Sequence, residues 1–225
     1  MRFQTVLFDL DGTLIDHLPA IHRCYVHTLP QLGLPAPTRE DVRRAIGGGL
    51  ENAMRRFVSE ADLPRALAIF RAYWDQTMLD GVELMPGAIE LLRALHAHGA
   101  TSAVLTNKHG PSSRRVCEYL GIQPLLRGVF GAGDTPWLKP DPQLTARVLE
   151  SLGAGPETAC LVGDSPFDAE TARRGGIAGF FVTTGTHSAE DLRAAGAAHV
   201  YPNLTALGRD AFGLELVSSG PCRMI

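Results

Sequence analysis

The segment Val6-Leu7-Phe8-Asp9-Leu10-Asp11-Gly12-Thr13-Leu14-Ile15-Asp16 decides the fold of this 225-residue chain. Its apolar beginning predicts a buried β-strand, and three carboxylates follow where that strand should stop. Carboxylates at the C-terminal end of a buried strand lie where parallel α/β sheets bind ligands. A polar turn explains one aspartate, but not two at alternate positions with Gly-Thr directly behind them. We therefore expect a functional site at Asp9 and Asp11.

Composition and charge narrow the class of protein. The net charge is −3 and no stripe of Lys or Arg occurs, which argues against nucleic-acid or membrane partners. The cysteines are too far apart for a zinc or disulfide framework: Cys24, Cys117, Cys160 and Cys222. No signal-peptide pattern and no apolar run of about 18 residues is found. We expect a cytoplasmic protein with a small polar partner, as a monomer or a homodimer.

From about residue 16 to residue 83 the chain shows only helical patterns. Apolar residues recur at helical spacing from Leu18 to Leu32, where Pro30 should kink or end the helix. Thr38 and Asp41 resemble a capping box that opens a second helix. Two further helical segments hold Leu50 to Val58 and Leu67 to Met78. These patterns predict an all-helical domain over residues 17–83.

Strands and helices alternate in the remainder of the chain. Apolar strands are predicted near residues 102–105, 129–130, 160–162 and 179–182, with helices between them. Such βα units in series predict a doubly wound parallel sheet. The fold class is therefore α/β, with a Rossmann-like core of residues 1–16 and 84–225 and an inserted helical domain. Its short connections, near residues 16–18 and 83–86, are suited to act as hinges.

Three further segments carry polar groups at predicted strand ends or adjoining loops. Thr106-Asn107-Lys108 offers donors for phosphate oxygens, although an ordinary loop would look the same. Lys139 is followed by Pro140, which stiffens the loop around its ammonium group.

The third segment, Gly163-Asp164-Ser165-Pro166-Phe167-Asp168, follows an apolar strand. Its oxygen ligands suit Mg²⁺. Asp164 is the expected direct ligand, and Asp168 binds the metal directly or through water.

Together these segments resemble the four motifs of the haloacid dehalogenase-like superfamily, in the right order over residues 6–168. The resemblance implies that Asp9 is the nucleophile and that Asp11 is the general acid and base. It also implies phosphate contacts from Thr106, Asn107 and Lys108. Lys139 would be the fixed cation, and Asp9, Asp11, Asp164 and Asp168 would hold Mg²⁺.

The resemblance also favours one branch of the superfamily. Asp11 speaks against dehalogenases, and the segments DLDGTLID, TNK, KPDP and GDSPFDAETARRGG look most like phosphoglycolate phosphatases. His17 and Arg173-Arg174 depart from those relatives and leave the substrate open. The expected activity is Mg²⁺-dependent hydrolysis of a small phosphorylated metabolite through an aspartyl-phosphate. A phosphosugar mutase and a non-catalytic phosphate-sensing module are the alternatives.

The helical insert resembles the C1-type cap of the superfamily. Gly47-Gly48-Gly49 is its candidate loop facing the site, and Gly48 a candidate substrate contact. Three glycines also simply break a helix, and both interpretations stay open.

Overall fold

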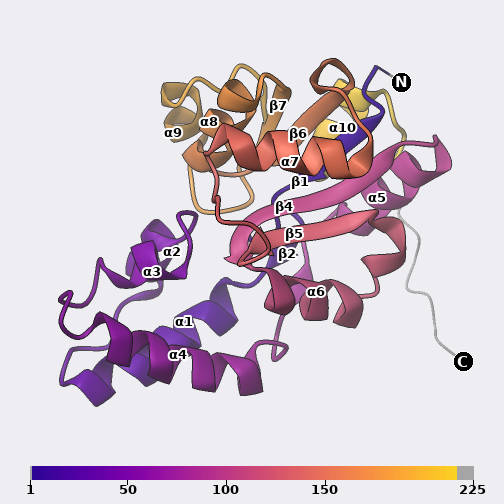
Figure 1. The fold of residues 1–225 in the computed structure, drawn as a ribbon. Coiled ribbons are helices and arrows are strands. Elements are labelled where there is room, and N and C mark those ends of the chain that lie inside the picture. The colour runs from indigo at the N-terminus through magenta and orange to yellow at the C-terminus, as the bar shows by residue number, and fades with distance from the viewer. Residues whose placement is uncertain (1, 217–225) are drawn as a thin grey trace, which may run out of the picture.

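The computed structural model describes residues 2–216. Six parallel strands form one sheet in the order β5-β4-β1-β6-β7-β8 (Figure 1). They are β1 (Thr5–Phe8), β4 (Thr101–His109), β5 (Gly128–Ala132), β6 (Ala159–Gly163), β7 (Ala178–Val182) and β8 (Val200–Tyr201). The predicted α/β fold is confirmed, and the first predicted strand lies inside the sheet between β4 and β6.

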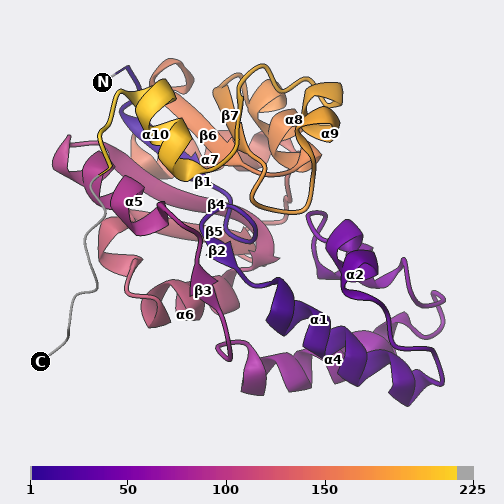
Figure 2. The ribbon, with the colours of Figure 1, turned by 180° about the vertical axis from the view of Figure 1, so that it is seen from behind.

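Helices cover both faces of this sheet (Figures 1 and 2). One face carries α5 (Ala88–Ala97), α6 (Gly110–Tyr119) and α10 (Leu204–Phe212); the other carries α7 (Pro142–Leu152), α8 (Pro166–Gly175) and α9 (Ala189–Ala194). Short 3₁₀ turns are η2 (Gln123–Leu125) and η3 (Pro156–Thr158). In β1, Val6 and Phe8 pack on the first face and Leu7 on the second. Burial on both faces explains the unbroken apolar run of this strand.

Four helices stand apart from the sheet around an apolar cluster of their own (Figure 1). They are α1 (Leu18–Thr28), which continues as η1 (Leu29–Leu32), α2 (Arg39–Ala45), α3 (Leu50–Met54) and α4 (Leu63–Thr77). We call α1 to α4 the cap helices. As predicted, the first α-helix ends near Pro30: it stops at Thr28, and Pro30 lies in the 3₁₀ turn that follows. Thr38 and Asp41 form the predicted capping box.

The chain enters and leaves the cap helices through a small ribbon that the sequence did not predict. β2 (Ile15–Asp16) pairs in antiparallel fashion with β3 (Glu83–Leu84). Two-residue strands carry no periodicity, so only helices were expected between Asp16 and Glu83. The two predicted hinge segments thus lie side by side.

Three other expectations differ from the structure. α3 ends at Met54, and Val58 packs on the cap cluster from outside the helix. α9, β8 and α10 were not predicted. β4 continues to His109 with an irregular register after Leu105, so Thr106 to Lys108 belong to the strand's irregular end and not to a loop. No helix within residues 2–216 is long and apolar enough to cross a membrane.

Candidate active site

A turn at the end of β1 brings Asp9 and Asp11 to one cavity. The strand stops at Phe8, and the Asp9 N–H donates to the Val162 carbonyl of β6 at 2.9 Å. The chain then bends back, with the Leu14 N–H on the Leu10 carbonyl at 2.9 Å. This turn, and not strand alternation, therefore places the two carboxylates at the site.

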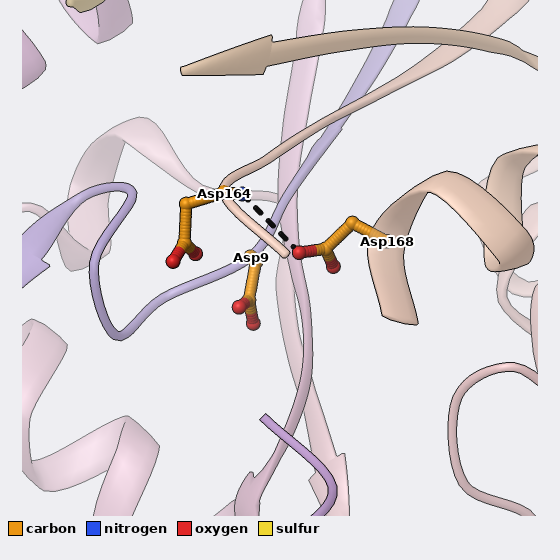
Figure 3. Close-up of side chains that lie close together, drawn as sticks. All are labelled: Asp9, Asp164 and Asp168. Carbon is orange, nitrogen blue, oxygen red and sulfur yellow. Dashed lines mark hydrogen bonds between the residues drawn. The ribbon is translucent and has the colours of Figure 1, made fainter. Parts of the chain in front are cut away.

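Asp9, Asp164 and Asp168 form a buried carboxylate cluster (Figure 3). One oxygen of each lies within 4.8 Å of the others, and none of the three residues is more than 7% exposed. Burial raises the pKa of Asp9 to about 6 and that of Asp164 well above its ordinary value. Carboxylates crowded in this way repel unless cations or protons join them, and hard oxygen donors suit Mg²⁺. The cluster therefore fits a divalent cation.

Lys139 supplies a fixed positive charge beside this cluster. Its Nζ lies 2.9 Å from Asp9 Oδ1 and 2.6 Å from Asp168 Oδ1, and the residue is only 4% exposed. Burial by itself would lower the pKa of Lys139, but Asp168 and Asp9 outweigh it and raise the pKa above its ordinary value. The ammonium is thus charged and held against Asp9.

Asp168 has both of its oxygens engaged. Oδ1 accepts from Lys139, while Oδ2 accepts from Ser165 Oγ at 2.6 Å and from the N–H groups of Ser165 and Asp164 at 3.0 and 3.2 Å, the latter dashed in Figure 3. These bonds fix Lys139 and the loop after β6. Asp9 and Asp164 are consequently the better placed side chains for a metal.

Asp164 is held by hydrogen bonds and close glycines that the sequence did not predict. Thr13 Oγ1 donates to its Oδ1 at 3.1 Å, and the Thr186 N–H donates to Oδ2 at 3.0 Å. Gly12 and Gly185 close around it, since a Cβ at Gly185 would lie only 1.8 Å from Oδ2. The polar run after β7, which contains Gly185 and Thr186, also follows a strand end, but it has no carboxylate to mark it as a site.

We expect Gly185→Ala to weaken Mg²⁺ binding about 10- to 100-fold, because its methyl group must displace the Asp164 carboxylate. The backbone of Gly185 has no positive φ, so alanine itself is not strained there. Calorimetric titration with Mg²⁺ measures the effect. An unchanged affinity for Mg²⁺ would contradict this role of Gly185.

Asp11 lies between two basic side chains. Lys108 Nζ donates to its two oxygens at 3.0 and 2.9 Å, and His17 Nδ1 lies 3.4 Å from Oδ1. Burial would raise the pKa of Asp11, but Lys108 and His17 together lower it below its ordinary value. His17 Nε2 also lies 2.6 Å from the carbonyl oxygen of Met78, directly after α4. The ring of Trp74 in α4 packs against Lys108, with its centroid 4.6 Å from Lys108 Nζ. Cap helices thus contact the groups around Asp11.

One cavity of about 720 Å³ is lined by most of the predicted site residues. Its core wall includes Asp9, Asp11, Thr106, Asn107, Lys108 and Asp164, and its cap wall includes Tyr25, Gly47, Gly48, Gly49, Phe70 and Trp74. Lys139 and Asp168 do not line this cavity, but the Lys139 ammonium contacts both Asp9 and Asp168. The three glycines both separate α2 from α3 and border the cavity. A second cavity of about 500 Å³ reaches Asp11 from the side of α2.

The chain is similar to proteins of one known family. Residues 6–182 match the family model described as haloacid dehalogenase-like hydrolase. The chain is 33% identical over 216 residues to a phosphoglycolate phosphatase of Rhodospirillum rubrum, covering 91% of this chain and 89% of that protein. A phosphoglycolate phosphatase of Pseudomonas putida is 32% identical over 214 residues, covering 91% and 78%. A haloacid dehalogenase-like hydrolase structure from Streptococcus pneumoniae superposes with a TM-score of 0.85 at 26% identity, covering 95% and 99%.

Proposed function

Because the chain belongs to the haloacid dehalogenase-like hydrolase family and is a phosphatase, we propose that it hydrolyses a small phosphorylated metabolite, phosphoglycolate or a close relative, with Mg²⁺. The observation that carries this proposal is the buried Asp9 carboxylate, which borders the cavity with Lys139 behind it and Asp164 beside it. Two relatives named phosphoglycolate phosphatase support the choice of substrate.

In the proposed reaction the Asp9 carboxylate attacks phosphorus, and the bond to the leaving alcohol breaks, which leaves an aspartyl-phosphate. Asp11 gives a proton to the leaving oxygen and afterwards takes one from the water that hydrolyses the intermediate. The Lys108 ion pair holds Asp11 as a carboxylate, the form needed for the second step. Asp11 therefore needs a proton before the first step: the entering anionic phosphate competes for Lys108 and weakens the ion pair, so that Asp11 takes up from solvent water the proton that it then donates.

Phosphate oxygens are bound by neighbouring donors. Thr106 and Lys108 come from the end of β4 on the core wall of the cavity. Lys139 stabilises the negative charge around Asp9 electrostatically. Mg²⁺, held by the Asp9 and Asp164 carboxylates and the Asp11 carbonyl, would offset the repulsion between an anionic nucleophile and an anionic phosphate. Asp168 orients Lys139.

The cap helices, with hinges at β2 and β3, would close over this cavity and exclude bulk water. In this proposal residues 17–83 form the cap domain and the remainder forms the core. The apolar and aromatic cap wall, with Tyr25, Phe70 and Trp74, would meet the leaving group.

The decisive experiment is release of phosphate from p-nitrophenyl phosphate with and without Mg²⁺. A panel of phosphoglycolate, sugar phosphates, nucleotides and pyrophosphate, ranked by kcat/KM, then identifies the substrate. Transfer of phosphate within a sugar, with little free phosphate, would indicate the mutase. No Mg²⁺-dependent release from any ester would contradict the proposal.

For Asp11→Asn we expect kcat to fall about 10²- to 10⁴-fold on alkyl phosphates, because the leaving alkoxide then receives no proton. With p-nitrophenyl phosphate, whose leaving group needs little protonation, the formation of aspartyl-phosphate should be affected far less. Single-turnover kinetics on both esters measures the difference. Equal losses on the two esters would argue against Asp11 as the general acid.

A further inference from the structure

Asn107 has its side-chain amide fully engaged. Its Oδ1 accepts from the Lys139 N–H at 2.8 Å, and its Nδ2 donates to the Lys139 carbonyl and to the Gly47 carbonyl, each at 3.1 Å. Only this orientation of the amide matches one donor and two acceptors. No amide hydrogen remains for a substrate, so the predicted phosphate contact through this side chain has no free donor.

The Asn107 side chain links two parts of the protein, and Gly47, one of its partners, belongs to the cap helices' side. Gly47, Gly48 and Gly49 connect α2 with α3, and this segment lies close to Phe167 and Asn107 of the core. A Cβ at Gly47 or Gly48 would approach the Phe167 ring to 3.1 Å, and one at Gly49 would lie 3.6 Å from the Asn107 carbonyl oxygen. Gly47 and Gly49 also have φ values of +121° and +88°, which favour glycine. The segment is therefore shaped to dock on the core.

Lys139, the other partner of Asn107, contacts the proposed nucleophile. Both main-chain polar groups of Lys139 are held by Asn107, and its Nζ lies 2.9 Å from Asp9. The Asn107 side chain thus bonds both the Gly47–Gly49 segment and Lys139, whose ammonium lies beside Asp9.

We propose that Asn107 is a positioning residue that couples docking of the Gly47–Gly49 segment to the placement of Lys139 beside Asp9. The catalytic consequence rests on the proposed phosphatase function. When the cap is docked, Gly47 and Lys139 hold the amide in one orientation; when the cap opens, Asn107 loses one of its three bonds and Lys139 loses part of its support.

The test uses Asn107→Asp and Asn107→Ala in the full chain. The Asn107→Asp side chain keeps an acceptor for the Lys139 N–H but turns a carboxylate oxygen towards two carbonyls, so it breaks the link selectively. We expect kcat on p-nitrophenyl phosphate to fall about 10- to 100-fold in both variants, with a smaller change in KM, since misplacement of about 1 Å costs that much. Wild-type kcat in Asn107→Asp would overturn the proposal, because the Lys139 N–H contact alone would then suffice.

A second readout follows the cap directly. The sequence has two tryptophans, and Trp137→Phe leaves Trp74, which packs under Lys108 in the docked state. With Mg²⁺ and inorganic phosphate, acrylamide quenching of Trp74 should be stronger in Asn107→Asp than in the parent protein. Lower kcat with unchanged quenching would overturn the coupling. If the wild type releases no phosphate from any ester, the proposed function fails, while this quenching experiment still decides whether Asn107 holds the cap segment.

Gly48→Ala gives an independent route to the same link. Its methyl group pushes against Phe167 and should lift the segment, which lowers kcat and raises Trp74 quenching as Asn107→Asp does. Because both changes break one link, the double variant should be little worse than either single variant. Fully multiplicative losses in kcat would overturn a shared link.

Discussion

Asp9→Asn is expected to lower kcat by at least about 10⁴-fold, the scale seen when a nucleophile is removed from an enzyme. The amide has nearly the same shape as the carboxylate but cannot attack phosphorus to give an acyl phosphate. Acid quenching during turnover should trap phosphorylated wild-type protein and no phosphorylated variant. The two measurements together test the chemical step and not only its rate.

The fold of this variant should be intact. The pKa of Asp9 is raised to about 6 in spite of its ion pair with Lys139, so burial and the nearby carboxylates outweigh that pair, and a neutral side chain relieves both when no metal is bound. We therefore expect a thermal midpoint in EDTA no lower than that of the wild type. Asp80→Asn, on the exposed surface after α4, is the matched control and should keep full activity. Near-normal turnover by Asp9→Asn would refute the mechanism.

Lys139→Met is expected to give the largest loss of stability. It removes the ammonium that lies 2.9 Å from Asp9 and 2.6 Å from Asp168, and both carboxylates stay buried. Breaking a buried ion pair on one side costs about 3 to 5 kcal/mol. For a chain of this size that corresponds to a fall in Tm of about 6 to 20 °C. The measurement is thermal unfolding in EDTA near pH 8.

The loss should depend on pH in a defined direction. The folded pKa of Asp9, about 6, is already above the unfolded value of about 4, chiefly because of burial, and Lys139 works to lower it. Without Lys139 the folded pKa rises further. A raised folded pKa gives stability that is fully present below about pH 4 and is lost as the pH rises through the folded pKa. The deficit of Lys139→Met should therefore be small near pH 4 and largest above pH 7.

Lys139→Arg is the matched control for this experiment, because it keeps the positive charge. It should recover most of the stability even if its geometry lowers activity. An equal deficit at pH 4 and pH 8 would show that packing, and not the ion pair, explains the effect of Lys139→Met.

The sequence predicted five of the six strands of the sheet and most of the helices, because their patterns are local. The apolar run before Asp9 is buried on both faces, and the capping box at Thr38 is formed as its spacing indicated. The β2–β3 ribbon was missed, since two residues show no period. The sequence also predicted that the polar segments after the strands lie at one edge of the sheet, because the carboxyl ends of parallel strands meet at the same edge.

The sequence by itself determined three things. They are the acidic segment from Val6 to Asp16, the parallel sheet that this segment enters, and the set of polar residues at the ends of its strands. Tertiary structure alone decided which partner each group has. Lys108 pairs with Asp11, Lys139 with Asp9 and Asp168, and Asn107 with Gly47. The physical reason is that hydrogen bonds and ion pairs depend on distances of about 3 Å between atoms far apart in the chain, which no local pattern records.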